Sequence, residues 1–351
     1  MKRKVEIIVE IAQGYEGNKK LADLLTKGAI ASKADAVKFQ LVYADELATP
    51  DYEHYQLFKD LEMDQNIWEN ICTQIHNKNI KVYFDVFGLF SLEMAKKIGA
   101  DGVKLSTTEF YNNRLFDSAI ALFDVIYLSV GGISIEDVDK KLSALSSEQV
   151  NKICLMYGFQ AEPTPLDQNN LNKLKLFKHR YPNYRIGFMD HSDGSLDDAF
   201  YLPLVALGVG VDVIEKHITL DRSEDWDWNE TGRGLDYYSS LEPVEFKTFV
   251  KNMHQCEIAF GTGKITNVQK DYLQHATRIT INKTVKPGDL LFKKDILFRR
   301  TDDADYFFPN EVENVIPGVV TRQLEADSGL TKKDIKKNAR VGIIVVCRLD
   351  S

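Results

Sequence analysis

The sequence contains no run of about 18 apolar residues, the length that a membrane-spanning helix requires. Near the amino terminus, an apolar run of only about seven residues follows Lys2, Arg3 and Lys4 and ends at Glu10. This run is shorter than the apolar region and cleavage site of a secretory signal peptide, so we expect it to be the first strand of the fold. The sequence therefore predicts a protein that does not act in a membrane.

Cysteine is scarce, with four residues in 351, and no two cysteines have the C-x-x-C spacing of metal and redox sites. We expect reduced, mostly packing thiols, as in a cytoplasmic protein, at Cys72, Cys154, Cys256 and Cys347. The chain also lacks a block of Lys and Arg, and its formal net charge is −8. Nucleic-acid binding requires a basic face, so the composition argues against a nucleic-acid partner.

No G-x-G-x-x-G motif follows the first predicted strand, which weakens the case for an open dinucleotide-binding sheet. Instead, short β-rich runs alternate with longer amphipathic stretches such as residues 18–32. The predicted strands are 6–12, 36–40, 81–86, 102–106, 124–129, 152–157, 185–189 and 211–216. Such alternation implies parallel pairing. Eight units over about 260 residues favour a closed (β/α)8 TIM barrel, with an open doubly wound sheet as the alternative.

The pattern changes near the end of the predicted barrel domain, residues 1–262. Residues 263–276 are expected to form a linker with a short helical piece, and residues 277–351 a small turn-rich module. A module of about 75 residues is near the lower limit for an independent core, so we expect it to depend on a partner surface. Its last apolar run, 341–346, is predicted to be a further strand, to which we assign no role.

Two histidines stand where predicted strands end, in Asp190-His191 and in Glu215-Lys216-His217. The carboxyl ends of barrel strands meet at one mouth, so we expect the two imidazoles to bind one divalent metal there. Asp190 and Glu215 are expected to orient them. Imidazoles with open water positions favour a first-row ion, Mn²⁺ with Mg²⁺ or Co²⁺ as alternatives. The alternative interpretation is a pair of hydrogen-bonded structural histidines.

Two lysines, Lys38 and Lys104, lie inside apolar strands, where a charge is costly unless it is paired or functional. We expect both to point into the barrel mouth and to hold an anionic substrate. The alternative is a pair of buried ion pairs with Glu10 and Glu109. Polar residues that recur at the other strand ends include Gln40, Asp85, Ser106, Ser129 and Gln160.

Several short motifs in this order resemble the sialic acid (N-acetylneuraminate) synthase family over nearly the whole chain. They are Val9-Glu10-Ile11, Ala36-Val37-Lys38-Phe39-Gln40, Val103-Lys104-Leu105-Ser106, Leu128-Ser129-Val130-Gly131, Asp190-His191-Ser192 and Glu215-Lys216-His217-Ile218-Thr219-Leu220-Asp221. Residues 285–288, 297–300 and 315–318 resemble the antifreeze-like (SAF) domain of that family.

The resemblance implies a metal-dependent, C–C bond-forming transferase of surface-polysaccharide biosynthesis. It would condense phosphoenolpyruvate with an N-acylated amino-sugar aldehyde, release phosphate and form a nonulosonic 2-keto acid. The resemblance implies catalytic roles for Glu10, His191 and His217, with both histidines on the metal. It implies substrate contacts from Lys38, Lys104, Ser129, Gln40, Asp236 and Arg300. From their positions near the predicted strand ends, Asp85, Ser106, Gln160 and Glu162 are further candidates for substrate binding. Arg300 would reach the sugar from the other subunit of a domain-swapped homodimer.

Several positions near the expected site depart from the family pattern. Gly14-Tyr15 replaces Asn-His, Asp85 replaces a Ser or Thr, Gln160 and Glu162 replace Asn and Tyr, and Met189 replaces Ser. Carboxylates at positions 85 and 162 repel a phosphate unless they bind metal, protons or sugar hydroxyls. The departures favour the same condensation with a different acceptor sugar. The alternatives are a changed donor or a non-catalytic sugar-binding protein.

Overall fold

The computed structural model describes residues 4–158, 161–223, 236–302 and 305–337. The chain divides into two compact units, residues 1–261 and residues 262–351.

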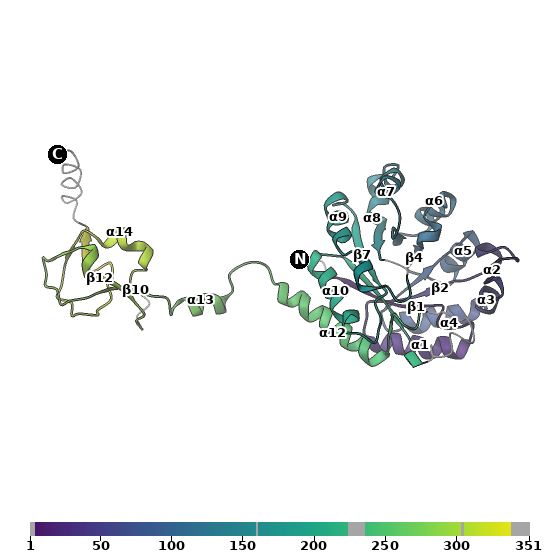
Figure 1. The fold of residues 1–351 in the computed structure, drawn as a ribbon, viewed down its shortest axis with the longest axis horizontal. Coiled ribbons are helices and arrows are strands. Elements are labelled where there is room, and N and C mark those ends of the chain that lie inside the picture. The colour runs from purple at the N-terminus through teal and green to yellow at the C-terminus, as the bar shows by residue number, and fades with distance from the viewer. Residues whose placement is uncertain (1–3, 159–160, 224–235, 303–304, 338–351) are drawn as a thin grey trace. The chain divides into compact units, whose positions relative to one another are not determined.

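The first unit is built on a closed barrel of eight parallel strands (Figure 1). The strands are β1 Glu6–Ala12, β2 Ala36–Gln40, β3 Lys81–Asp85, β4 Gly102–Leu105, β5 Ile126–Ser129, β6 Ile153–Tyr157, β7 Arg185–Asp190 and β8 Val213–Ile218. Each strand pairs with the next one along the chain, and β1 also pairs with β8, which closes the sheet. A further strand of two residues, β9 (Ser240–Leu241), pairs with β8. The predicted TIM barrel is confirmed, and the open doubly wound alternative is wrong.

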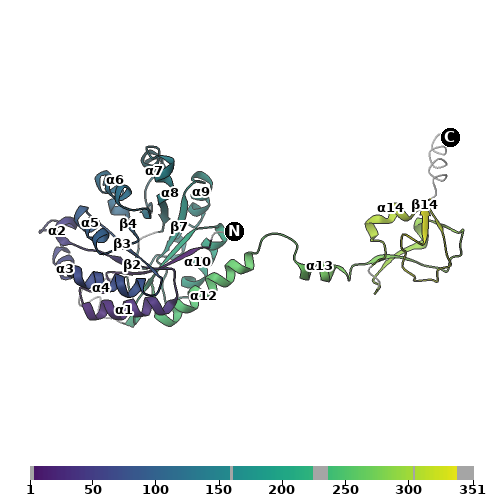
Figure 2. The same ribbon diagram turned by 180° about the vertical axis from the view of Figure 1, so that it is seen from behind.

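Helices lie around the outside of the strands, as both views show (Figures 1 and 2). They are α1 Lys19–Ser32, α2 Ala44–Leu47, α3 Tyr55–Asp60, α4 Gln65–His76, α5 Leu89–Lys97, α6 Asn113–Leu122, α7 Ile135–Leu142, α8 Ser147–Lys152, α9 Asn172–Arg180, α10 Asp198–Val209 and α12 Pro243–Phe260. The start of α1 illustrates the local cause, because the Asn18 side chain accepts hydrogen bonds from the backbone N–H groups of Lys20 and Leu21. In the described part of the chain, no helix combines the length and apolar character needed to cross a membrane.

The amino-terminal end of the barrel interior is closed by packed aromatic and aliphatic side chains. Tyr83 and Tyr127 lie edge to face, with ring centroids 5.0 Å apart, and both are buried. Their hydroxyls donate to the Glu6 carboxylate over 2.6 and 2.9 Å, and Arg185 pairs with the same carboxylate. This end of the barrel is therefore closed by a packed core layer, and the polar cavity lies at the other end.

The strand register brings the charged residues of the opposite end together. Glu10 on β1 is directly beside Lys38 on β2 and His217 on β8. Asp85 on β3 is directly beside Lys104 on β4. Neighbouring residues of parallel strands point to the same side of the sheet, so these five side chains face one interior. The barrel closure thus converts separate sequence motifs into one cluster.

The second unit contains two small sheets and short helical segments. Its elements are α13 Asn267–Leu273, β10 Arg278–Ile281, β11 Leu290–Leu291, β12 Ile296–Arg299, α14 Val312–Val315, β13 Gly318–Val320 and β14 Ile335–Lys337. β10 pairs with β12, and β11, β13 and β14 form the second sheet, all antiparallel. A separate apolar core includes the buried residues Ile279, Ile281, Leu291, Val315 and Leu330. The predicted strand at 341–346 lies outside the described residues, and the antifreeze-like assignment of this unit stays a prediction.

Candidate active site

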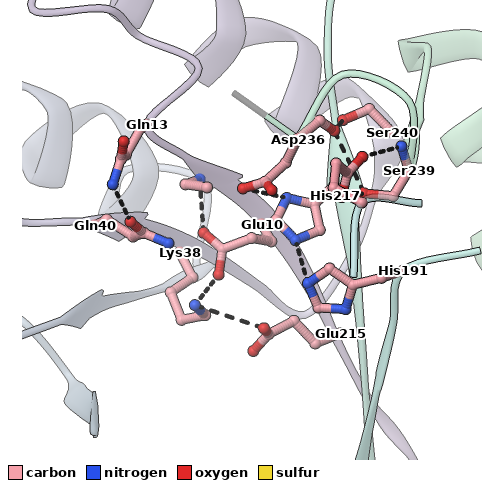
Figure 3. Close-up of polar contacts among 12 residues, drawn as sticks. Glu10, Gln13, Lys38, Gln40, His191, Glu215, His217, Asp236, Ser239 and Ser240 are labelled. Carbon is pink, nitrogen blue, oxygen red and sulfur yellow. Dashed lines mark hydrogen bonds and ion pairs between the residues drawn. The ribbon is translucent and has the colours of Figure 1, made fainter. Parts of the chain in front are cut away.

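A polar cavity of about 300 Å³ lies at the carboxyl ends of the barrel strands (Figure 3). Its lining comprises Glu10, Gln13, Gln40, Asp85, Phe87, Lys104, Ser106, Glu162, His191, His217 and Asp236. Nine of these eleven residues are site residues predicted from the sequence, and the exceptions are Gln13 and Phe87. The cavity is therefore the place where the sequence-predicted site residues of the first unit converge.

Lys38 lies at the centre of a buried charge network beneath this cavity. Its side chain is fully buried and forms an ion pair with Glu10. The Lys38 Nζ atom is 2.5 Å from Asp85 Oδ1 and 3.6 Å from Glu215 Oε1. Glu10 is fixed a second time, because its Oε1 accepts a hydrogen bond of 2.6 Å from the backbone N–H of Ala12. Mutual pairing of this kind is what makes such burial of charge tolerable.

Lys104 reaches the same network from the other side. Its Nζ atom is 2.7 Å from Glu215 Oε1 and 3.4 Å from Asp85 Oδ2. Burial opposes the charged form, but these two carboxylates outweigh it and raise the pKa of Lys104. The expected alternative partner was Glu109, and that is wrong, because Glu109 lies in the turn after β4 and accepts a hydrogen bond from Asn112 instead. Both lysines point inward, and both are already neutralised by carboxylates.

The two predicted histidines meet at the cavity wall. His191 Nε2 and His217 Nε2 are 3.1 Å apart, and the ring centroids are 4.8 Å apart. Burial, reinforced by the nearby Lys104 charge, lowers the pKa of His191 to about 4. Burial and the neighbouring His191 hold the pKa of His217 well below its ordinary value. Both imidazoles are therefore neutral near pH 7, the form in which a histidine ligates a metal.

The imidazole pair fits a divalent metal ion. Imidazole nitrogens bind such an ion at about 2.1 Å, so two of them on one ion are no more than about 4.2 Å apart. The observed separation of 3.1 Å between the Nε2 atoms is within that limit. Within the described residues, no group of three or more His, Cys, Asp or Glu side chains forms a larger metal cluster. Protein ligation would come from His191 and His217, and water or substrate would complete the coordination.

The expected support of the two imidazoles by Asp190 and Glu215 is wrong. The carboxylate beside His217 is that of Asp236, whose Oδ2 is 3.8 Å from His217 Nδ1. Asp190 points to the other side of the barrel wall, where its Oδ2 is 2.7 Å from Lys216 Nζ and both side chains are fully buried. Lys216 also donates 2.9 Å to the backbone oxygen of Ser192. Glu215 forms ion pairs with Lys38 and Lys104. Among the described residues, His191 Nδ1 has no hydrogen-bond partner. The strand alternation separates Asp190 from His191, because successive side chains point to opposite faces. Glu215 and His217 share one face of β8, but the Glu215 carboxylate is paired with these two lysines instead.

A second acidic group, Glu162 with Asp236, lines the cavity next to the histidines. Both Glu162 oxygens are held by Ser239, with the backbone N–H at 2.6 Å and the hydroxyl at 2.8 Å. Burial and the charge of Asp236 raise the pKa of Glu162 to about 8. Burial raises the pKa of Asp236 to about 6, although a hydrogen bond with Glu162 opposes the shift. The two carboxyl groups therefore share a proton near neutral pH.

This carboxyl pair predicts a pH-dependent stability. The pKa of Glu162 is raised from 4.5 to about 8 in the folded protein, so folding binds a proton and stability falls as the pH rises through that range. We expect Glu162→Gln to remove this loss. Because the Glu162 residue is exposed, solvent screens its charge and reduces the effect, so we expect the wild type to lose only about 1 kcal/mol relative to the variant between pH 5 and pH 8. Urea unfolding at both pH values measures the difference. Glu93→Gln, a change of an exposed residue on α5, is the control, and equal losses in wild type and Glu162→Gln would contradict the prediction.

The remaining predicted residues have different positions. Gln40 lines the cavity and accepts a hydrogen bond of 2.7 Å from Gln13 Nε2. Ser129 is fully buried, outside the cavity lining, and its hydroxyl is 2.6 Å from that of Thr107. Gln160 lies outside the described residues. Arg300 follows β12 in the second unit and is exposed, and its contact with a sugar stays a prediction.

Sequence reasoning missed three contributors to the site. Gln13 follows β1 directly and had a detectable signal, namely a polar residue at a strand end. Phe87 supplies the aromatic wall and gave no signal, because buried Phe residues are common in barrels. Ser239 positions Glu162 from 77 residues further along the chain, and only the fold brings the two together.

The chain was compared with known proteins. A sequence model of the NeuB family matches residues 25–265. N,N'-diacetyllegionaminic acid synthase of Campylobacter jejuni is 25% identical over 317 residues, which cover 85% of this chain and 91% of that protein. Among solved structures, spore coat polysaccharide biosynthesis protein E of Chromobacterium violaceum is similar in fold, with a TM-score of 0.77 at 19% identity, covering 95% of this chain and 100% of that one. N-acetylneuraminic acid (sialic acid) synthetase of Leptospira borgpetersenii has a TM-score of 0.69 at 25% identity, covering 78% of this chain and 91% of that one.

Proposed function

We propose, from the premise that the chain belongs to the NeuB family, that it is an enzyme condensing phosphoenolpyruvate with an N-acylated amino-sugar aldehyde. The products would be phosphate and a nonulosonic 2-keto acid. The relatives' names support the class of reaction, since they include synthases of legionaminic, pseudaminic and sialic acids. The observation that carries the proposal is one cavity lined by His191, His217, Lys104 and Glu10.

The chemistry requires two reactants to meet in a fixed geometry. Carbon 3 of phosphoenolpyruvate is nucleophilic and attacks the aldehyde carbon of the sugar, which places negative charge on the aldehyde oxygen. Holding the donor by its charged groups brings the reacting carbons together and removes much of the entropic barrier. Lys104 lines the cavity and Lys38 lies directly beneath it, so the lysine end of the cavity is where we place the donor.

The second step is the addition of water at carbon 2 of the donor, after which the phosphate leaves. A carboxylate near this carbon would take the proton of the water. Glu10 is suitably placed, because the strand register puts it between Lys38 and His217 and its side chain lines the cavity. Its hydrogen bond from Ala12 and its ion pair with Lys38 hold the carboxylate in one orientation.

A divalent ion, with Mn²⁺ as the expected metal, would bind at His191 and His217. When bound, it supplies Lewis-acid stabilisation of the charge that develops on the aldehyde oxygen. The sugar would occupy the part of the cavity between the histidines and the polar groups of Gln13, Gln40 and Asp236. These groups offer both donors and acceptors, as sugar hydroxyls require.

The test is a product assay. The purified chain is incubated with phosphoenolpyruvate, Mn²⁺ and a panel of N-acyl hexosamines and 2,4-diamino-hexoses, with unsubstituted aldoses as comparison. We expect phosphate release together with a mass that equals sugar plus pyruvate for at least one N-acyl acceptor. If adducts form only with unsubstituted aldoses, the proposed class of acceptor is wrong. If neither phosphate release nor an adduct is detected with any sugar of the panel, the proposed condensation is wrong.

We also propose that the chain forms a homodimer in which the first residues of the second unit, 262–276, take part. The segment from residue 262 onward exposes large apolar side chains, with Ile265 71%, Val268 78%, Tyr272 73% and Leu273 59% exposed. Contiguous apolar groups of this kind commonly mark a contact between proteins. The exchange of terminal modules between subunits, with Arg300 reaching the partner's sugar, belongs to the same proposal.

Charge placed in this segment is expected to separate the subunits. Val268→Asp with Tyr272→Asp puts two carboxylates on one side of α13, and we expect the mass in solution to fall from dimer to monomer. Light scattering after size-exclusion chromatography measures the mass. Lys270→Glu changes the opposite side of the same helix and is the control, expected to stay dimeric. A wild type that is monomeric at tens of micromolar, or a double variant that stays dimeric, would count against the proposal.

A further inference from the structure

The charge network at the barrel mouth contains more carboxylates than ammonium groups. Glu10, Asp85 and Glu215 surround Lys38 and Lys104, and each of the five side chains is at least nine-tenths buried. With these groups ionised, the network carries one net negative charge before any ligand arrives. A network that is to bind an anion by its lysines would be expected to carry a surplus of positive charge.

Asp85 is the carboxylate that places the excess negative charge of the network at the cavity surface. One of its oxygens is 2.5 Å from Lys38 Nζ and the other is 3.4 Å from Lys104 Nζ. One oxygen on each lysine is also the arrangement that an anionic group of a ligand would adopt between two ammonium groups. Asp85 lines the cavity, so it stands at the place where that ligand would enter.

The other two carboxylates do not compete in this way. Glu10 is directed to Lys38 and to the backbone N–H of Ala12. Glu215 lies outside the cavity lining and contacts Lys104 from below, at 2.7 Å. Of the three carboxylates, Asp85 alone both bridges the lysines and faces the cavity. Removing its charge leaves two lysines with two carboxylates, a neutral network that an anion can approach without net repulsion.

We infer that Asp85 is a built-in competitor of the anionic donor and therefore determines donor affinity and charge selectivity. This inference rests on the proposed function, because it places the donor at the lysines. A ligand with three negative charges must displace or tolerate Asp85 at a greater electrostatic cost than a ligand with one. The site accordingly discriminates against highly charged anions in favour of anions of lower charge.

The test compares ligands of increasing charge by titration calorimetry, with no divalent ion added. The ligands are pyruvate, malonate and phosphoenolpyruvate, and the proteins are wild type, Asp85→Asn and Asp85→Ser. We expect Asp85→Asn to bind phosphoenolpyruvate at least about tenfold more tightly than wild type and pyruvate less than about threefold more tightly. Asp117→Asn, the same change of charge at an exposed position on α6, is the control and leaves all three affinities unchanged.

Phosphoenolpyruvate affinity that is unchanged or lower in both Asp85 variants would overturn the inference, and so would an equal gain for all three ligands. If neither variant folds, as judged by circular dichroism, the affinities of the wild type for the three ligands test the inference. We expect the wild type to bind pyruvate more tightly than phosphoenolpyruvate, and a steep rise in affinity from pyruvate to phosphoenolpyruvate would contradict the role of Asp85. Product assays on the same proteins separate this inference from the proposed function. Tighter binding without condensation overturns only the function, whereas condensation without tighter binding overturns only the role of Asp85.

Discussion

Replacement of His191 by alanine is expected to lower the condensation rate by about 10³-fold and to abolish tight Mn²⁺ binding. The reason is that Lewis-acid stabilisation by a metal is worth several kcal/mol, and each 1.36 kcal/mol is a tenfold change in rate. His217→Ala should have the same effect, because the two Nε2 atoms are 3.1 Å apart and can bind one ion. The rate is measured by phosphate release and the metal affinity by titration calorimetry.

The double variant makes this prediction sharper. If the two imidazoles act through one ion, removing the second adds little to the loss caused by removing the first. If they act independently, the two losses multiply. His76→Ala is the matched control, because His76 is an exposed histidine on α4 that contacts Asp101 at 2.8 Å. Single variants that keep activity within about tenfold of wild type would favour the alternative of two structural histidines.

Replacement of Lys38 by methionine is expected to have the largest effect on stability. The change leaves Glu10 without its ion pair and removes the shortest contact of Asp85, in a fully buried place. Breaking a buried ion pair by removing one partner costs about 3–5 kcal/mol, because the remaining charge is stranded. The free energy of unfolding from urea denaturation at pH 7 measures the loss.

The control for this variant is a lysine with a similar contact at the surface. Lys27 Nζ is 2.6 Å from Asp23 Oδ2 on the exposed side of α1. Lys27→Met is expected to cost no more than about 0.5 kcal/mol, since surface pairs of this spacing are worth little. A Lys38→Met protein within about 1 kcal/mol of wild type would show that the network does not depend on this charge.

The barrel was predictable from sequence because its signals are local. Each strand is a short apolar run, and each is followed by an amphipathic stretch whose buried face repeats with helical spacing. Closure of the sheet, which no single segment encodes, followed from the number of units. The eight predicted strands agree with the observed ones within two residues at each end.

The candidate site was predictable as a list but not as a set of contacts. Polar residues at strand ends identified Glu10, Lys38 and His217, because such positions are unusual in apolar strands. Their partners depend on register and on side-chain alternation, which explains why Asp190 was assigned to His191 rather than to Lys216. The neutralisation of Lys104 by Glu215, 111 residues further along the chain, has no sequence signal.

The metal site can be tested directly by diffraction at the manganese absorption edge, on crystals of the full chain grown with Mn²⁺. We expect one strong anomalous peak within bonding distance of both Nε2 atoms, of His191 and of His217, inside the cavity that Lys104 and Glu10 also line. A map with no peak at that point, and with the two imidazoles still hydrogen-bonded to each other, would contradict this expectation.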